Sequence, residues 1–139
     1  MFPSHDLSGI YESVYGTDPL DSGLDVRFIF ESNCVAGSSQ LLEYGVKTGA
    51  WPELTTPILI QNNGLILGKG GAGSRGDGGN GGPAMQLEAD IRLKNLNIIG
   101  GGGGGGAGYV DPGDPGLEDD EGAGGGGGAG YTVGLGARS

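Results

Sequence analysis

Glycine is the feature of this sequence that most restricts its fold. The chain has 139 residues, 35 of them glycine, and only six glycines precede Gly64. The other 29 lie between Gly64 and Gly136. A run such as residues 100–106 has no side chains with which to build a core, and each ordered glycine costs about 0.5–1 kcal/mol more backbone entropy than alanine. An ordinary globular fold is therefore excluded for this part of the chain.

Apolar alternation predicts short strands in the remaining sequence, and no segment has a convincing helical period. Residues 62–64, Asn-Asn-Gly, predict a chain reversal between two apolar strands. A change of phase at Asn95 and Leu96 predicts a bulge within the last strand. The predicted strands cover residues 26–30, 33–36, 57–60, 65–67 and 89–99. Trp51, among small loop residues, is expected to close the edge of a thin core.

The glycine runs predict a second structure that needs only the main chain. An extended left-handed helix with three residues per turn directs its N–H and C=O groups outward, and neighbouring glycine helices approach closely because no Cβ separates them. The octapeptide GGGGGAGY at residues 102–109 recurs at residues 124–131, which indicates stacked copies. We therefore expect a mainly β and irregular chain. A short N-terminal β segment over residues 1–63 is followed, over residues 64–139, by a bundle of polyglycine II helices joined by loops. Valine at Gly104 is expected to disrupt this bundle.

Charge and composition exclude several classes of function. The 17 acidic and 7 basic residues give a net charge of −10, which repels nucleic acid phosphates. His5 is the only histidine, so neither a histidine-based triad nor a multi-histidine metal site can form, and Cys34 has no disulfide partner. No residue run is apolar enough to span a membrane, and no secretory signal begins the chain. We expect no enzyme, cofactor or metal.

Two short motifs in the glycine-rich half are interpreted as chance matches in a sequence rich in glycine. Residues 68–73 match G-x-G-x-x-G, but no helix can follow them to face a dinucleotide pyrophosphate. Residues 75–77 spell Arg-Gly-Asp, which in a glycine-rich context reads as an exposed turn.

The residues also resemble a known family, the glycine-rich tip domains of bacteriophage tail fibres and related host-attachment proteins. The resemblance covers about residues 46–136, roughly two thirds of the chain. Its elements are a Thr-Gly-Ala-Trp-Pro loop, two joins from an apolar strand into a glycine run, and a Gly-Gly-Asn-Gly-Gly-Pro-Ala stretch. These occupy residues 48–52, 58–73, 78–84 and 95–108.

The resemblance implies a virion protein at the distal end of a tail or tail fibre. Its partners would be other fibre subunits and a bacterial receptor, an outer-membrane protein or glycan. It would be a homotrimer or a single cap on a trimeric fibre. Loops between the glycine runs would contact the receptor, with the acidic insert of residues 111–121 as the first candidate. The expected receptor-binding residues are Arg75, Asp77, Tyr109, Asp111, Asp114, Glu118, Asp119, Asp120, Glu121 and Tyr131.

Alternatives remain open on the sequence alone. The acidic insert reads equally well as a solvated loop, and its spacing does not fit an EF-hand calcium site. The glycine runs also suit a polyglycine II ice- or surface-binding protein, although such a protein would be expected to show regular threonines and disulfides. A flexible glycine-rich linker is the third alternative.

Overall fold

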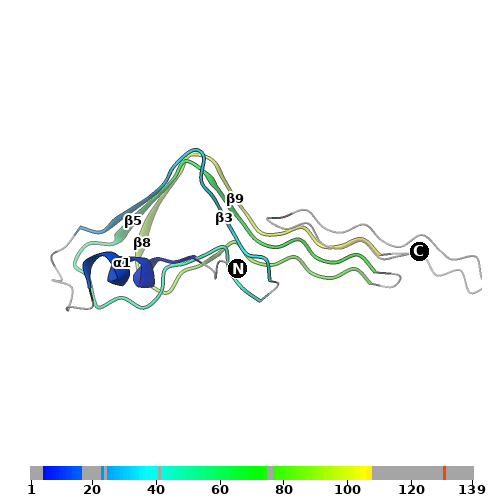
Figure 1. The fold of residues 1–139 in the computed structure, drawn as a ribbon, viewed down its shortest axis with the longest axis horizontal. Helices are drawn as coiled ribbons and strands as arrows, with labels where there is room; N and C mark the ends of the chain where they lie inside the picture. The colour runs from blue at the N-terminus through cyan, green and yellow to red at the C-terminus, as the bar shows by residue number, and fades with distance from the viewer. Residues whose placement is uncertain are drawn as a thin grey trace, which may run out of the picture.

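The computed structural model describes residues 5–16, 23, 25–40, 42–74, 77–107 and 130. Within these ranges the chain forms one short helix and nine short strands, which build three parallel sheets of three strands each (Figure 1). None of the described residues belongs to a helix long and apolar enough to cross a bilayer. In chain order the elements are β1 (His5–Asp6), α1 (Leu7–Tyr15), β2 (Arg27–Phe30), β3 (Val35–Gly37), β4 (Val46–Lys47), β5 (Ile58–Asn62), β6 (Leu65–Leu67), β7 (Met85–Gln86), β8 (Ile91–Asn95) and β9 (Ile98–Gly100).

The three sheets arise because the chain passes around the same path three times. Their strand orders are β1-β4-β7, β2-β5-β8 and β3-β6-β9, all parallel. We call β1–β3 coil 1, β4–β6 coil 2 and β7–β9 coil 3, and the three coils together the β stack. Because each coil adds one strand to every sheet, coil 2 is covered on both sides and coils 1 and 3 form the two ends.

Alternating side chains of the strands supply the core of the β stack. In β5, Ile58 and Ile60 point inward and are 1% and 0% exposed. Phe28 of β2 and Leu93 of β8 are the register partners of Ile60 in coils 1 and 3. The buried apolar core consists of Leu7, Val26, Ala36, Val46, Ile58, Ile60, Ile66 and Ala84.

A sharp corner joins the sheet of β5 to the sheet of β6 (Figure 1). Asn62 is fully buried there, and its Oδ1 accepts the Gly64 N–H at 3.1 Å. A Cβ on Gly64 would lie 2.3 Å from the Cys34 carbonyl oxygen of coil 1, so only glycine fits between the coils. The predicted reversal at residues 62–64 is thus wrong, because β5 and β6 belong to different sheets and turn a corner. The predicted bulge near Asn95 is the same corner in coil 3.

Helix α1 was not predicted from the sequence. Asp6 caps its N-terminus, since its Oδ1 accepts the Ser8 N–H at 3.1 Å and the Gly9 N–H at 3.4 Å. Leu7 is the only helical residue that is fully buried. The helical period is present in the sequence, with apolar or aromatic residues at 7, 10, 11, 14 and 15, and the sequence-based prediction missed it.

Three extended glycine-rich segments leave the β stack together (Figure 1). We call residues 68–73 segment G1, residues 78–82 segment G2 and residues 101–106 segment G3. Main-chain hydrogen bonds join them at three-residue intervals: Gly68 N–H to Gly100 O, Gly71 to Gly103, Gly79 to Ala72, Gly82 to Lys69, Gly102 to Gly82 and Gly105 to Gly79. G1 therefore accepts from G2, G2 accepts from G3, and G1 donates to Gly103 of G3 and to Gly100 at the end of β9.

The predicted fold class is wrong in its main element. The chain is mainly β, but its architecture is three parallel three-stranded sheets with one short helix, and not a bundle of polyglycine II helices. The physical reason lies in the apolar strands, which the sequence shows at β2, β5 and β8. Their side chains bury a common core, whereas the glycine residues between them bury none. The stack also takes β6, β7, β8 and β9 from the sequence beyond residue 63.

Candidate receptor-binding and attachment surfaces

Asp77 is the one predicted receptor-binding residue that lies among the described residues. It is exposed, in the turn that joins G1 to G2, and its carbonyl oxygen accepts a hydrogen bond from the Ser74 hydroxyl. The other nine predicted residues lie outside the described ranges: Arg75, Tyr109, Asp111, Asp114, Glu118, Asp119, Asp120, Glu121 and Tyr131.

The structure brings the starting points of the two predicted receptor loops together. Ser74, at the end of G1, forms an isolated parallel bridge with Ala107, at the end of G3. The first loop begins at Ser74, and the acidic insert follows Ala107 in the sequence. Both depart from the end of the glycine segments that is farther from the β stack (Figure 1). Gly130 lies at the opposite end, against Gly68 and Gly70.

Close packing of every third glycine holds the three segments together. A Cβ on Gly102 would lie 1.7 Å from the Lys69 carbonyl oxygen, and one on Gly105 would lie 1.9 Å from the Ala72 oxygen. At Gly104 the nearest atom would be 3.6 Å away. Positions with comparably short approaches occur in G1 at Gly68 and Gly71 and in G2 at Gly78 and Gly81. The segments are therefore closely packed, and a fixed set of glycines faces the neighbouring segments.

The free end of coil 3 is a second candidate surface. Leu93 points inward like Ile60, yet 43% of it is exposed because no further coil covers it within the described ranges. Leu96 and Ile98, beside it at the corner, are 60% and 55% exposed. As the last strand of its sheet, β8 also presents unpaired main-chain groups on its outer edge. Such an edge can pair with another parallel strand.

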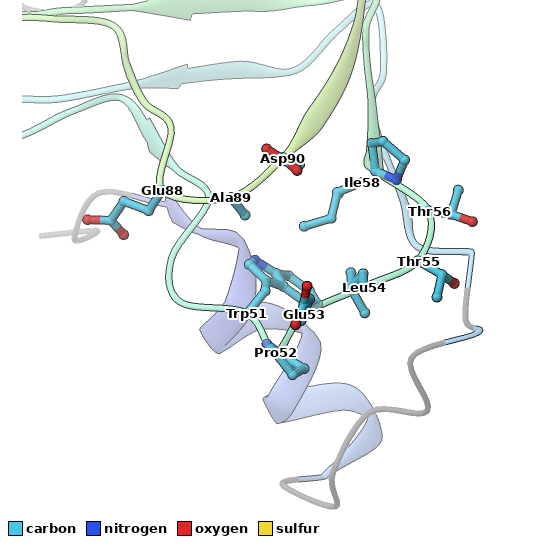
Figure 2. A pocket seen from close by; sticks show the side chains of 11 residues that line it. Trp51, Pro52, Glu53, Leu54, Thr55, Thr56, Ile58, Glu88, Ala89 and Asp90 are labelled. Carbon is cyan, nitrogen blue, oxygen red and sulfur yellow. The ribbon is translucent and has the colours of Figure 1, made fainter.

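A pocket of about 240 Å³ lies between the loop before β5 and the loop before β8 (Figure 2). Its walls include Trp51, whose indole N–H donates to the Thr48 carbonyl oxygen at 2.6 Å and whose ring meets Tyr11 edge-on at 5.4 Å. Trp51 thus packs against the core, as expected for a residue that closes its edge. The pocket is lined by apolar, hydroxyl and acidic side chains, among them Trp51, Leu54, Glu53, Glu88 and Asp90, and none of the residues that line it is basic.

The described part of the chain contains no metal-binding cluster. No group of three histidine, cysteine, aspartate or glutamate side chains there is arranged to hold a metal ion. Cys34 is half-buried with a free thiol.

Comparison with protein families identifies the kind of protein that carries the glycine segments and the free end of coil 3. Residues 4–139 match the family model of the phage tail fibre adhesin Gp38. The chain belongs to this adhesin family. The match covers the β stack and the glycine segments alike, so both are parts of the adhesin. Searches of curated proteins and of solved structures found no match for the chain.

Membership of this family confirms the resemblance to tail-fibre attachment proteins. The adhesin is a component of the virion tail, and adhesion is a binding function that involves a host surface and a fibre. Sequence reasoning missed the free end of coil 3, because exposure of Leu93 depends on where the stack ends. It also missed the acidic pocket, since Glu53, Glu88 and Asp90 are brought together only by pairing of coils 2 and 3.

Proposed function

We propose that the adhesin uses two separate surfaces for its two binding functions, attachment to the tail fibre and contact with the host. The free end of coil 3 attaches it to the tail fibre, and the loops at the far ends of the glycine segments contact the bacterial receptor. The observation that supports this division is the geometry of the chain. An uncovered apolar stack end lies in one part, and a rigid main-chain support leads away from it in the other (Figure 1).

Attachment through coil 3 is proposed because the end of a parallel stack has unpaired main-chain groups and uncovered side chains. Its outermost strands need partners for their main-chain groups, and its inward side chains need a covering layer. Coil 3 presents three edge strands, β7, β8 and β9, in three separate sheets. A trimeric fibre tip can offer one strand from each of its three chains to these three edges. A single adhesin capping a trimeric fibre therefore fits this surface better than an adhesin homotrimer.

Receptor recognition falls to the loops that begin at Ser74 and after Ala107. Rigid support is useful here because a loop held on ordered main chain loses less entropy when it binds. The acidic insert contributes Asp111, Asp114, Glu118, Asp119, Asp120 and Glu121, and Tyr109, Tyr131, Arg75 and Asp77 complete the proposed receptor-binding set. The insert suits a receptor with basic or hydroxyl-rich surface groups, in an outer-membrane protein or a glycan. On this proposal the adhesin is at the distal end of the fibre and has no enzymatic activity.

Two binding assays on one variant test the division of work. Replacing Asp119, Asp120 and Glu121 together by serine should reduce binding of the purified adhesin to host cells. The same variant should bind the phage's own fibre subunit as tightly as the wild type does, because the attachment end is unaltered. Unchanged binding to host cells would remove the acidic insert as the receptor site, and loss of fibre binding would refute the separation of the two functions.

A further inference from the structure

Asparagine side chains at the corner of the β stack form a hydrogen-bond ladder in which donation runs in one direction, from one coil to the next. The register aligns Phe30 of coil 1, Asn62 of coil 2 and Asn95 of coil 3. The Nδ2 of Asn62 donates to Asn95 Oδ1 at 2.8 Å and to the Ile98 carbonyl oxygen at 3.2 Å. Both acceptors belong to coil 3. The ladder therefore donates from coil 2 toward coil 3, and Asn62, which is fully buried, is satisfied on both its oxygen and its nitrogen.

Asn95 occupies in coil 3 the position that Asn62 occupies in coil 2, but only its side-chain oxygen has a hydrogen-bond partner among the described residues. Its Oδ1 accepts from Asn62, but its Nδ2 donates no hydrogen bond to any of the described residues. The side chain is exposed, and so is the neighbouring Leu96. By the direction of the ladder, the Asn95 amide donors belong to the side of coil 3 on which a fourth coil would lie.

We propose that Asn95 sets the register of a fourth coil, supplied by the tail-fibre subunit, by donating its amide hydrogens to carbonyl oxygens at that coil's corner. This inference rests on the attachment surface proposed above and adds the chemistry of the partner. In coils 2 and 3 an inward apolar residue precedes the asparagine by two positions, as Ile60 precedes Asn62 and Leu93 precedes Asn95. The fibre segment should therefore have an apolar residue, any residue and then an asparagine at the corner, in a parallel strand.

A second copy of the adhesin does not fit this position. Head-to-tail stacking would place coil 1 of one copy on coil 3 of the next, and the residue aligned with Asn95 would then be Phe30. A phenylalanine ring offers no acceptor in place of Asn95 Oδ1, so only a main-chain carbonyl at the position of Ile98, that of Val35 in coil 1, would be left to accept from the Asn95 amide. Two chains of net charge −10 would also repel each other. The chain's own residues 101–106 turn away from the stack to join the other glycine segments.

The test measures binding of purified adhesin variants to the phage's own tail-fibre subunit. Asn95→Asp keeps an oxygen that accepts from Asn62, so the thermal stability of the free adhesin should be unchanged. It removes the amide donors, so affinity for the fibre should fall about tenfold or more. Asn80→Asp makes the same chemical change in the exposed part of G2 and should leave the affinity unaltered. Wild-type affinity of Asn95→Asp would overturn the inference.

A third variant separates this inference from the proposed function. Leu93→Arg puts a charge on the uncovered inward face and should abolish fibre binding without unfolding the free chain. If Leu93→Arg abolishes binding while Asn95→Asp binds normally, coil 3 is the attachment surface and the role of Asn95 is wrong. If Leu93→Arg binds normally, the attachment surface itself is wrong. Self-association of the adhesin that Leu93→Arg reverses would identify a second copy as the occupant and also overturn the inference.

Discussion

Ile60 and Leu93 are register partners in one inward-facing column of the β stack, yet Ile60 is fully buried and 43% of Leu93 is exposed. The two side chains are similar in size and polarity, so their difference in burial comes from the number of coils that cover them. The column therefore shows where the adhesin completes its own core and where, on the proposed function, the tail fibre covers it.

The first prediction concerns this column. Ile60→Ala should lower the free energy of unfolding by about 2–5 kcal/mol, because it opens a cavity in a filled core. Leu93→Ala should cost clearly less in the isolated adhesin, since water already reaches the side chain. Denaturant unfolding of both variants measures the difference. Equal losses would show that coil 3 is covered in the free chain and would contradict an open attachment end.

Close packing of the glycine segments gives the second prediction. Gly105→Ala should destabilise the segments, because its Cβ would lie 1.9 Å from the Ala72 oxygen and the main chain would have to separate. Gly104→Ala is the matched control, since the nearest atom would be 3.6 Å away. Amide hydrogen exchange of Gly71, Gly79 and Gly105 reports the result. Similar protection in both variants would mean that the segments do not pack as the hydrogen bonds indicate.

The sequence identified glycine as restrictive but could not say which glycines face inward. It predicted damage from valine at Gly104, whereas the structure places the closest approaches at Gly102, two residues before it, and at Gly105, the next residue. In an unbroken run of glycines no side chain marks the inward position. The spacing of three between close-packed positions therefore becomes visible only when the neighbouring segments are placed.

The third prediction concerns the corner. Asn62→Ala should destabilise the adhesin by about 1–3 kcal/mol, because it removes buried hydrogen bonds to Gly64 and to coil 3. Asn97→Ala, at an exposed position with one hydrogen bond to the Asn63 carbonyl oxygen, should cost less. Thermal unfolding of the two variants compares them. A larger loss of stability for Asn97→Ala than for Asn62→Ala would show that the hydrogen bonds of Asn62 do not stabilise the corner.

The positions of β2, β3, β5, β6, β8 and β9 were predicted from the sequence, whereas the two-residue strands β1, β4 and β7 and the pairing of all the strands were not. Residues 58–68 and 91–101 carry the same pattern with an offset of 33 residues, with apolar residues at 58, 60, 65 and 66 matched at 91, 93, 98 and 99 and asparagine at 62 matched at 95. This repeat was the available signal for stacked coils. The exact octapeptide repeat favoured stacked glycine helices instead. The period of 33 residues is harder to recognise because the residues between the matching positions differ.

Helix α1 supplies the fourth prediction. Asp6→Ala should reduce stability by about 0.5–2 kcal/mol, because it removes the side chain that accepts from the Ser8 and Gly9 amides. Glu12→Ala, on the exposed side of the same helix, should have little effect. Far-ultraviolet circular dichroism and denaturant unfolding measure both. A loss of stability for Glu12→Ala equal to that for Asp6→Ala would contradict the capping role.

An electron cryo-microscopy density map of the tail-fibre tip on intact phage particles tests the division of work most directly. The expected map shows the strands β7, β8 and β9 stacked on the last layer of the fibre, with the Ser74 and Ala107 ends of the glycine segments directed away from the particle. A map in which the glycine segments contact the fibre and coil 3 faces the host would contradict the proposed function.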